Sequence, residues 1–192
     1  MTALSRDSLS FAAAQKLYLG GQRDAAAKSL RSYVASYPKG YYLTDALYYL
    51  SDCYLLAGDR ENAIGTLTRL AGQGTNQYTV AVLEKLSGMT FEDKRWDEAA
   101  SAYRRLYDVA PTKTGREDAM TGYVRATVAG GDGAKIAEMA ADVCGHDDAG
   151  AVALREAKYA WAGQLRAEGR SAEAVKLYKE LAKEGRTKEG SE

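Results

Sequence analysis

A small or aliphatic residue followed by apolar residues four and seven positions later recurs five times along the chain. The small residues are Ala26, Ala63, Ala99, Ile136 and Ala174. The residues that follow them are Leu30 and Tyr33, Leu67 and Leu70, Tyr103 and Leu106, Ala140 and Val143, and Tyr178 and Leu181. Positions i, i+4 and i+7 share one face of an α-helix, whereas a strand alternates every second residue. The pattern therefore predicts helices near 23–37, 60–73, 96–110, 133–144 and 171–184.

The residues between these helices predict a second helix in each copy. Five positions before each small residue stands a turn residue, which is Gly21, Gly58, Lys94, Gly131 or Gly169. Twelve positions after it stands Pro38, Thr75, Pro111, Asp148 or Arg186. Proline ends a helix, and Thr or Asp can cap the next one. The preceding helices are therefore expected near 5–19, 41–57, 77–93, 114–129 and 149–168.

These residues resemble the tetratricopeptide repeat, a pair of helices with a known pattern of large and small positions. The second copy matches that pattern with Leu47, Leu50, Ser51, Tyr54, Ala63 and Leu67, and Thr75 stands in the closing proline position. The fifth matches with Trp161, Ala162, Leu165, Ala174 and Tyr178, although Lys158 and Arg186 depart. The period of about 37 residues exceeds the usual 34. With its segment "PKGYYLTDAL", it is similar to the repeats of bacterial cell-envelope proteins, such as the lipoprotein of the outer-membrane barrel-assembly machine and the Tol–Pal-associated coordinator.

The predicted fold class is all-α, a right-handed solenoid of about five helix pairs in which each pair buries the apolar face of the next. One repeat domain is expected over 1–192, with repeats near 5–38, 41–74, 77–111, 114–147 and 149–185. The segment "TKEGSE" at 187–192 aligns with "TKTGRE" at 112–117. Residues 186–192 are therefore predicted to begin a sixth repeat of a longer polypeptide.

The resemblance implies that the first helix of each pair lines a concave groove that holds a protein or peptide ligand. The register places on that surface Phe11, Gln15, Tyr18, Tyr48, Asp52, Leu55, Glu84, Phe91, Thr121, Arg125, Tyr159 and Arg166. Tyr and Arg are favoured at protein interfaces. The alternative is that some of these side chains pack against neighbouring first helices. The basic clamp with which some relatives hold a C-terminal carboxylate is absent from these positions, so binding of chaperone tails is not expected.

Charge and composition exclude several other classes. The chain has 26 basic and 26 acidic residues and no long basic stripe, which argues against nucleic-acid binding. No apolar run approaches the roughly 20 residues of a membrane span. Tyrosine, with 14 residues against two phenylalanines, is the main aromatic packing residue. The six tyrosines of the segment 37–64 are therefore interpreted as packing residues of stacked helices.

No catalytic, metal or cofactor site is predicted. Cys53 is expected to be a small buried hydrophobe because no cationic partner is near it in sequence. Cys144 and His146 could suggest a metal- or thiol-dependent enzyme, but two such ligands fall short of a closed zinc site. A capped loop is the preferred interpretation of that segment, and "GGDG" at 130–133 is read as a turn because it lacks the Lys-Ser/Thr of a phosphate loop.

The functional prediction is a non-enzymatic scaffold that binds a protein or peptide within a bacterial cell-envelope assembly. The resemblance places it in the periplasm or at the outer membrane, with the cytoplasm left open. One alternative is a structural spacer or oligomerisation domain of a longer polypeptide, without a groove ligand. A remote alternative is an enzyme centred on Cys144 and His146. The oligomeric state stays open.

Overall fold

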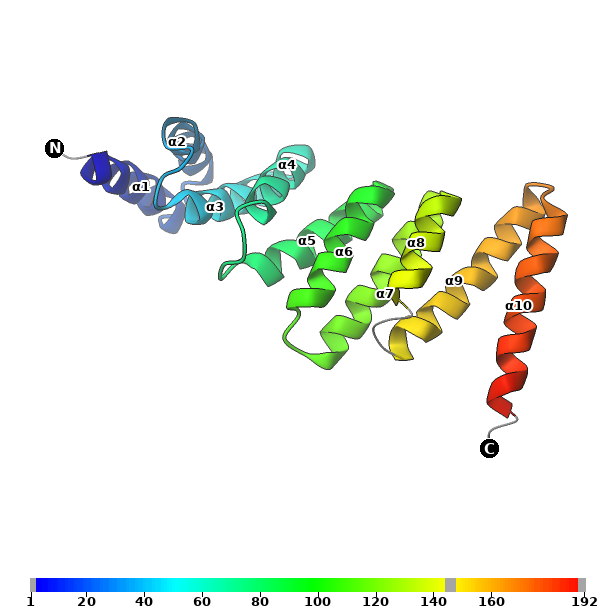
Figure 1. Cartoon of the computed structure of the whole chain (residues 1–192). Coiled ribbons are helices and arrows are strands. Elements are labelled where there is room, and N and C mark those ends of the chain that lie inside the picture. The colour runs from blue at the N-terminus through cyan, green and yellow to red at the C-terminus, as the bar shows by residue number, and fades with distance from the viewer. Residues whose placement is uncertain (1–2, 144–147, 190–192) are drawn as a thin grey trace. The chain divides into compact units, whose positions relative to one another are not determined.

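All regular secondary structure in the described part of the chain, residues 3–143 and 148–189 of a computed structural model, is α-helical (Figure 1). The helices are α1 (Ala3–Leu19), α2 (Arg23–Ser36), α3 (Leu43–Leu56), α4 (Arg60–Ala71), α5 (Thr79–Glu92), α6 (Trp96–Val109), α7 (Lys113–Gly130), α8 (Gly133–Val143), α9 (Asp148–Ala167) and α10 (Ser171–Glu189). The second helix of every pair begins at the predicted residue. The all-α class and the five helix pairs are confirmed.

The C-terminal end of α10 differs from the expected boundary. The sequence pattern predicts a helix that ends near 184, whereas α10 continues to Glu189. The run after Leu181 contains Lys, Glu, Arg and Ala, which are strong helix formers, and no proline interrupts it. Residues 186–189 therefore prolong the fifth pair, and 190–192 lie outside the described residues. The sixth repeat stays a prediction.

Each pair of helices is joined by the same turn. The turn residue has a left-handed backbone conformation in all five copies, with φ of 75° at Gly21, 72° at Gly58, 58° at Lys94, 70° at Gly131 and 80° at Gly169. In the second pair the Gly58 N–H donates to the Leu55 carbonyl at 3.1 Å, and the Asp59 N–H donates to Tyr54 at 2.9 Å. These bonds satisfy carbonyls that the end of a helix leaves free. Lys94 therefore adopts the left-handed conformation that glycine has in the other four turns.

The small residues of the sequence pattern lie at the centre of each helix pair. Ala26, Ala63 and Ala99 are fully buried, and Ile136 and Ala174 are at most 3 % exposed. Most of the large residues that follow them are also buried, including Leu30, Tyr33, Leu67, Leu70, Leu106, Val143 and Leu181. Helix backbones can approach closely only where side chains are small, and the larger residues then fill the space between neighbouring helices. The predicted core register is confirmed.

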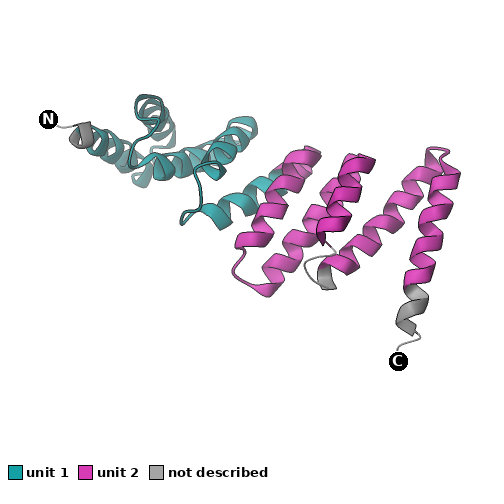
Figure 2. Cartoon of the chain, viewed as in Figure 1, with its two compact units in different colours: residues 1–89 teal, residues 90–192 magenta. Residues whose placement is uncertain are grey.

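The chain forms two compact units, residues 1–89 and residues 90–192, and the boundary falls within α5 (Figure 2). In unit 1, α1 packs against α2 and α3, and α3 packs against α2 and α4. In unit 2, α7 packs against α6, α8 and α9, and α9 packs against α8 and α10. Each unit thus contains stacked helix pairs with its own core. Among the described helices, none has the length and hydropathy that crossing a membrane requires.

Candidate partner-binding surfaces

Four polar and aromatic side chains of α1 and α3 form an ordered cluster on the first-helix surface of unit 1. The Tyr18 ring stacks on Tyr49 with 4.5 Å between centroids. The Tyr18 hydroxyl donates to Asp52 Oδ2 at 2.7 Å, and the Gln15 amide donates to the Tyr49 hydroxyl at 3.4 Å. All four residues are half-buried. We call Gln15, Tyr18, Tyr49 and Asp52 the tyrosine cluster.

Burial and the neighbouring carboxylate of Asp52 hold Tyr18 in its neutral form. Burial, followed by the hydrogen bond to Asp52, raises the pKa of Tyr18 to about 12. A deprotonated phenol beside a carboxylate would place two like charges in contact, which is unfavourable. The guanidinium of Arg23 lies 4.3 Å from the centre of the Tyr18 ring and also donates to the Tyr18 carbonyl at 2.8 Å. The ring is thus held by Tyr49 and Arg23, and its hydroxyl by Asp52.

Aromatic pairs also close the joints between successive helix pairs in unit 1. Phe11 stacks on Tyr42 with 4.6 Å between centroids and an interplanar angle of 2°. Tyr48 stacks on Tyr78 at 4.2 Å and 13°. The Tyr78 hydroxyl donates to Asp45 Oδ1 at 2.5 Å, and burial with this bond raises the pKa of Tyr78 to about 12. The tyrosine-rich segment therefore packs one helix pair against the next.

The side chain of Asp7 in α1 also connects the first helix pair to the second. The Tyr33 hydroxyl donates to Asp7 Oδ1, and the Tyr41 N–H donates to Asp7 Oδ2 at 2.9 Å. Asp7 is 6 % exposed, and each of its two side-chain oxygens accepts one of these hydrogen bonds. Burial and the bond to Asp7 raise the pKa of Tyr33 above its usual value.

The structure distributes the predicted groove residues of unit 1 between core and surface. Phe11 is only 4 % exposed, because Tyr42 covers it, and it does not line an open surface. Tyr48 is half-buried beneath Tyr78, and Leu55 is half-buried on α3. Glu84 on α5 is exposed. Gln15, Tyr18 and Asp52 come together in the tyrosine cluster.

The predicted residues of unit 2 form no comparable cluster. Phe91 packs edge-on against Trp96 at 5.2 Å and is half-buried. Arg125 lies 3.9 Å from Glu156, and both of these side chains are about two-thirds exposed. Two further predicted residues of α9 are exposed, namely Tyr159 and Arg166. The predicted residues on α7 are Thr121 and Arg125, and neither is aromatic. Thr121 is half-buried.

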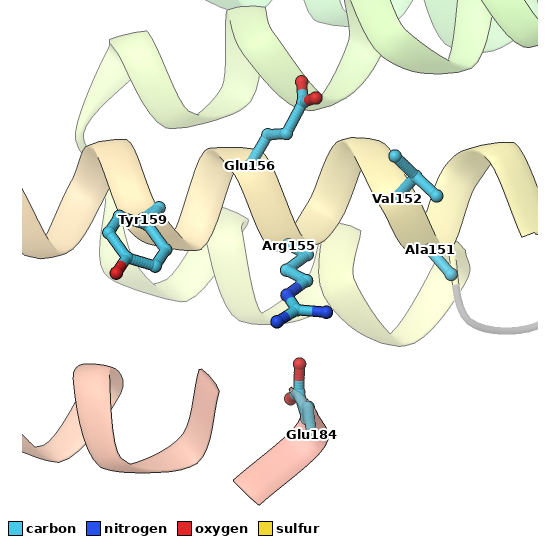
Figure 3. A pocket seen from close by; sticks show the side chains of 6 residues that line it. All are labelled: Ala151, Val152, Arg155, Glu156, Tyr159 and Glu184. Atoms are coloured by element: carbon cyan, nitrogen blue, oxygen red, sulfur yellow. The ribbon is translucent and has the colours of Figure 1, made fainter. Parts of the chain in front are cut away.

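A pocket of about 690 Å³ opens between α9 and α10 (Figure 3). It is lined by Ala151, Val152, Arg155, Glu156, Tyr159 and Glu184. Arg155 reaches from α9 toward Glu184, whereas Glu156 points to the opposite side of α9 (Figure 3). Val152 is 54 % exposed and Tyr159 59 %, so apolar surface is open to solvent here.

The second helices of unit 2 are joined by ion pairs. Arg104 on α6 donates to Asp142 on α8 at 2.6 Å, and Lys135 on α8 lies 2.7 Å from Asp97 on α6. Hydrogen bonds from Arg104 to Asp142 raise the pKa of the guanidinium above its usual value. Charged pairs therefore join these helices, and the Arg104 guanidinium also lies 5.6 Å from the centre of the Tyr107 ring.

Of the two cysteines, the structure describes Cys53. Cys53 is 2 % exposed, and burial raises the pKa of its thiol. A buried neutral thiol is a poor nucleophile. Cys144 and His146 lie outside the described residues. Within the described residues, no group of three His, Cys, Asp or Glu side chains is placed to hold a metal ion.

Sequence reasoning missed the partners that cover the groove residues. Tyr42 and Tyr49 are predicted to be packing residues and Tyr78 has no predicted role, but none of them is predicted to stack on a groove residue, as all three do. Their signal in the sequence is a tyrosine about 30 residues after an aromatic residue of the preceding first helix, as in Phe11 and Tyr42.

Successive helix pairs that stack through their first helices define this chain as a helical-repeat protein. Residues 9–40 and 45–73, which overlap the helix pairs α1–α2 and α3–α4, match the model of the tetratricopeptide repeat family. Tetratricopeptide repeats are in general protein-interaction modules. No curated protein matches the chain.

Three solved structures are similar to the chain at low sequence identity. MamA from Desulfovibrio magneticus RS-1, from residue 41 to its end, is 12 % identical over 97 % of this chain and 98 % of its own, with a TM-score of 0.47. A putative kinesin light chain of Podospora anserina with nearly identical TPR-like repeats is 16 % identical over 95 % and 96 %, with a TM-score of 0.42. A further MamA structure is 18 % identical over 92 % and 96 %, with a TM-score of 0.46.

Proposed function

We propose that the chain is a non-enzymatic scaffold that binds a protein or peptide on the first-helix surface of unit 1. The tyrosine cluster is the observation that supports this most strongly. The Tyr18 ring is held by Tyr49, Asp52 and Arg23 and yet stays partly open to solvent. An aromatic ring that is already ordered offers contact area to a partner without the entropy cost of fixing it on binding.

Two exposed leucines extend the apolar part of this surface. Leu19 at the end of α1 is 71 % exposed, and Leu56 at the end of α3 is 63 % exposed. Both stand seven residues before the small residue of their repeats, so they occupy equivalent places in successive pairs. A partner that covers the tyrosine cluster would also remove these side chains from water, which favours binding.

Negative charges introduced on this surface test the proposal. Photo-activated p-benzoylphenylalanine in place of Leu56 would cross-link the partner, which could then be identified. The affinity of that partner for the purified chain would be measured by calorimetry. The double variant Leu19→Glu and Leu56→Glu should bind the partner at least about tenfold more weakly, because each carboxylate must be desolvated at the interface. Thr68→Glu on the exposed surface of α4 is the matched control and should leave affinity unchanged.

Equal affinity of the double variant and the control would contradict the proposal. It would favour the alternative of a structural spacer without a ligand on this surface. A circular dichroism spectrum of each variant shows whether the helices are intact, so that a loss of binding is not a loss of fold.

The proposed setting of the scaffold is a bacterial cell-envelope assembly, in the periplasm or at the outer membrane. The support is the pattern of the repeats, with a period near 37 residues and the extended segment between Pro38 and the start of α3. Fractionation of cells that express the full gene product tests it. Recovery of the protein in the cytoplasmic fraction alone would contradict it.

A further inference from the structure

A further pocket, of about 700 Å³, lies at the joint between the first and second helix pairs of unit 1. The loop between α2 and α3 contributes Tyr37, Pro38, Lys39 and Tyr41 to its lining, and the start of α1 contributes Arg6. Tyr41 is 76 % exposed, and Tyr37 is half-buried. The pocket therefore combines two aromatic rings and a proline with two positively charged side chains.

The loop that carries these side chains is held in place by contacts within the chain. A Cβ atom at Gly40 would lie 2.6 Å from the Tyr33 hydroxyl oxygen and 2.8 Å from the Tyr37 Cβ, so the loop passes close to α2. The Tyr41 N–H donates to Asp7 Oδ2 at 2.9 Å. A ligand that binds this loop does not have to order it first, which lowers the entropy cost of binding.

Packing of the helix pairs does not require the aromatic and charged residues of this loop. Tyr42 directly precedes α3 and stacks on Phe11, and Tyr78 directly precedes α5 and stacks on Tyr48. The residues one, three and five positions before Tyr42 are Tyr41, Lys39 and Tyr37, whereas those before Tyr78 are Gln77, Thr75 and Gln73. The second joint thus closes in the same way without these rings or this charge. The side chains of the first joint are therefore available for another task.

The positive charge of the pocket is available to a ligand. Among the described side chains, no carboxylate forms an ion pair with Arg6 or Lys39. The acidic residue of the lining is Asp7, and its two oxygens already accept hydrogen bonds from the Tyr33 hydroxyl and the Tyr41 N–H. A guanidinium binds a carboxylate through two parallel hydrogen bonds, and an ammonium binds it as a point charge. The lining is therefore complementary to an anionic ligand.

The backbone of the loop favours carboxylates over a phosphate group as that anion. Phosphate sites in loops and at helix N-termini use backbone N–H groups that point at the ligand. Here the Gly40 N–H donates to the Tyr37 carbonyl at 2.9 Å, and the Leu43 N–H donates to the Gly40 carbonyl at 3.1 Å. The Tyr42 N–H donates to the Tyr33 hydroxyl at 3.2 Å. The cations of the pocket are thus side chains from two elements beside aromatic surface, which suits the separate carboxylates of a peptide.

We propose that this pocket binds an acidic peptide segment of a partner protein that carries an aromatic side chain. The aromatic side chain packs against Tyr37 and Tyr41, and neighbouring carboxylates pair with Arg6 and Lys39. The inference goes beyond the surface proposed above and does not rest on it. Leu19 marks that surface on α1 and lies about 20 Å along the helix axis from Arg6, at a rise of 1.5 Å per residue.

An acetylated, amidated peptide of sequence Gly-Asp-Glu-Trp-Glu-Asp-Gly is a suitable probe, because it places an aromatic ring between carboxylates on both sides. Its binding to the full chain is measured by calorimetry and by ¹⁵N chemical-shift changes. The amide signals of Lys39, Gly40 and Tyr41 are expected to move on titration. Affinity should fall as salt is added, because salt screens the attraction between exposed charges.

Substitutions in the pocket separate the charge from the ring. Arg6→Gln with Lys39→Gln should weaken probe binding about tenfold and reduce its salt dependence. Lys28→Gln with Arg69→Gln, at exposed positions of α2 and α4, makes the same change in net charge and should leave affinity unchanged.

Tyr41→Ala should weaken probe binding about fivefold, because the exposed ring and its apolar area are lost. The double variant Leu19→Glu and Leu56→Glu should bind the probe as the unaltered chain does. Retained probe binding in that variant would distinguish this pocket from the surface at the ends of α1 and α3. A circular dichroism spectrum of each variant checks that the helices are intact.

Several results would overturn the inference. These are no binding of the probe at millimolar concentration, equal binding of a probe with glycine in place of tryptophan, and equal loss from the pocket and control double variants. Displacement of the probe by inorganic phosphate or AMP at matched ionic strength would assign the pocket to a phosphorylated ligand and contradict the proposed peptide. Loss of probe binding in the Leu19→Glu and Leu56→Glu variant would place the probe on the other surface.

Discussion

A methyl group at Gly122 should destabilise unit 2, although alanine is the better helix former. A Cβ atom at Gly122 in α7 would lie 2.5 Å from Cδ1 and Cε1 of Tyr103 and 2.7 Å from Cζ. Carbon atoms in contact are normally about 3.5–4.0 Å apart. Tyr103 on α6 also meets Phe91 edge-on at 6.3 Å, which restricts how far the ring can move.

The expected magnitude follows from two opposing effects. Replacing a glycine inside a helix by alanine stabilises it by about 1 kcal/mol. Overpacking a well-filled contact costs about 1–3 kcal/mol. Gly122→Ala is therefore expected to lower the free energy of unfolding by about 1 kcal/mol. Gly163 in α9 is the matched control, because a Cβ there meets no atom within 4 Å. Gly163→Ala should raise the free energy of unfolding by about 0.5–1 kcal/mol.

Urea unfolding followed by tryptophan fluorescence measures both variants, since Trp96 and Trp161 both lie in unit 2. Truncation of the ring by Tyr103→Ala removes the clash, so Gly122→Ala should stabilise the protein in that background. The reasoning is refuted if Gly122→Ala and Gly163→Ala stabilise equally. It is also refuted if the effects of Gly122→Ala and Tyr103→Ala are additive.

Lys94→Gly should stabilise unit 2 by about 1 kcal/mol in urea unfolding, because a side chain in the left-handed conformation is strained, and an unchanged midpoint would contradict this. The pKa values of Tyr18 and Tyr78 are raised to about 12, above the usual value near 10. Their contribution to stability is therefore complete below about pH 10 and should be lost as the pH rises toward 12. Melting temperatures between pH 8 and 12, with absorbance at 295 nm, measure this, and titration of all tyrosines near pH 10 would oppose it. In a Cys144→Ser variant, the buried Cys53 should react with iodoacetamide on the order of 100-fold more slowly than in urea, and equal rates would disprove its burial.

The spacing of small and apolar residues was sufficient to predict the helices and their buried faces. Ala26, Ala63 and Ala99 define a register that recurs about every 37 residues, and helical periodicity converts it directly into a face. The turn glycines could be predicted for the same local reason, because a left-handed residue must end the first helix. Even Lys94 was placed correctly by its position in the repeat.

The extent of the candidate surfaces was decided by tertiary contacts. Periodicity placed Phe11, Tyr48 and Tyr159 at the same position of their repeats, yet their exposure differs widely. Tyr42 covers Phe11, and Tyr78 partly covers Tyr48, whereas Tyr159 is left open.

The sequence by itself determined the positions of the helices, the turns and the buried face of each pair, because these depend on residues close together in the chain. Only the tertiary structure decided which tyrosines are sealed and which can meet a partner. The physical reason is that the exposure of a side chain depends on the size of the residue that the next helix pair places against it, about 30 positions away.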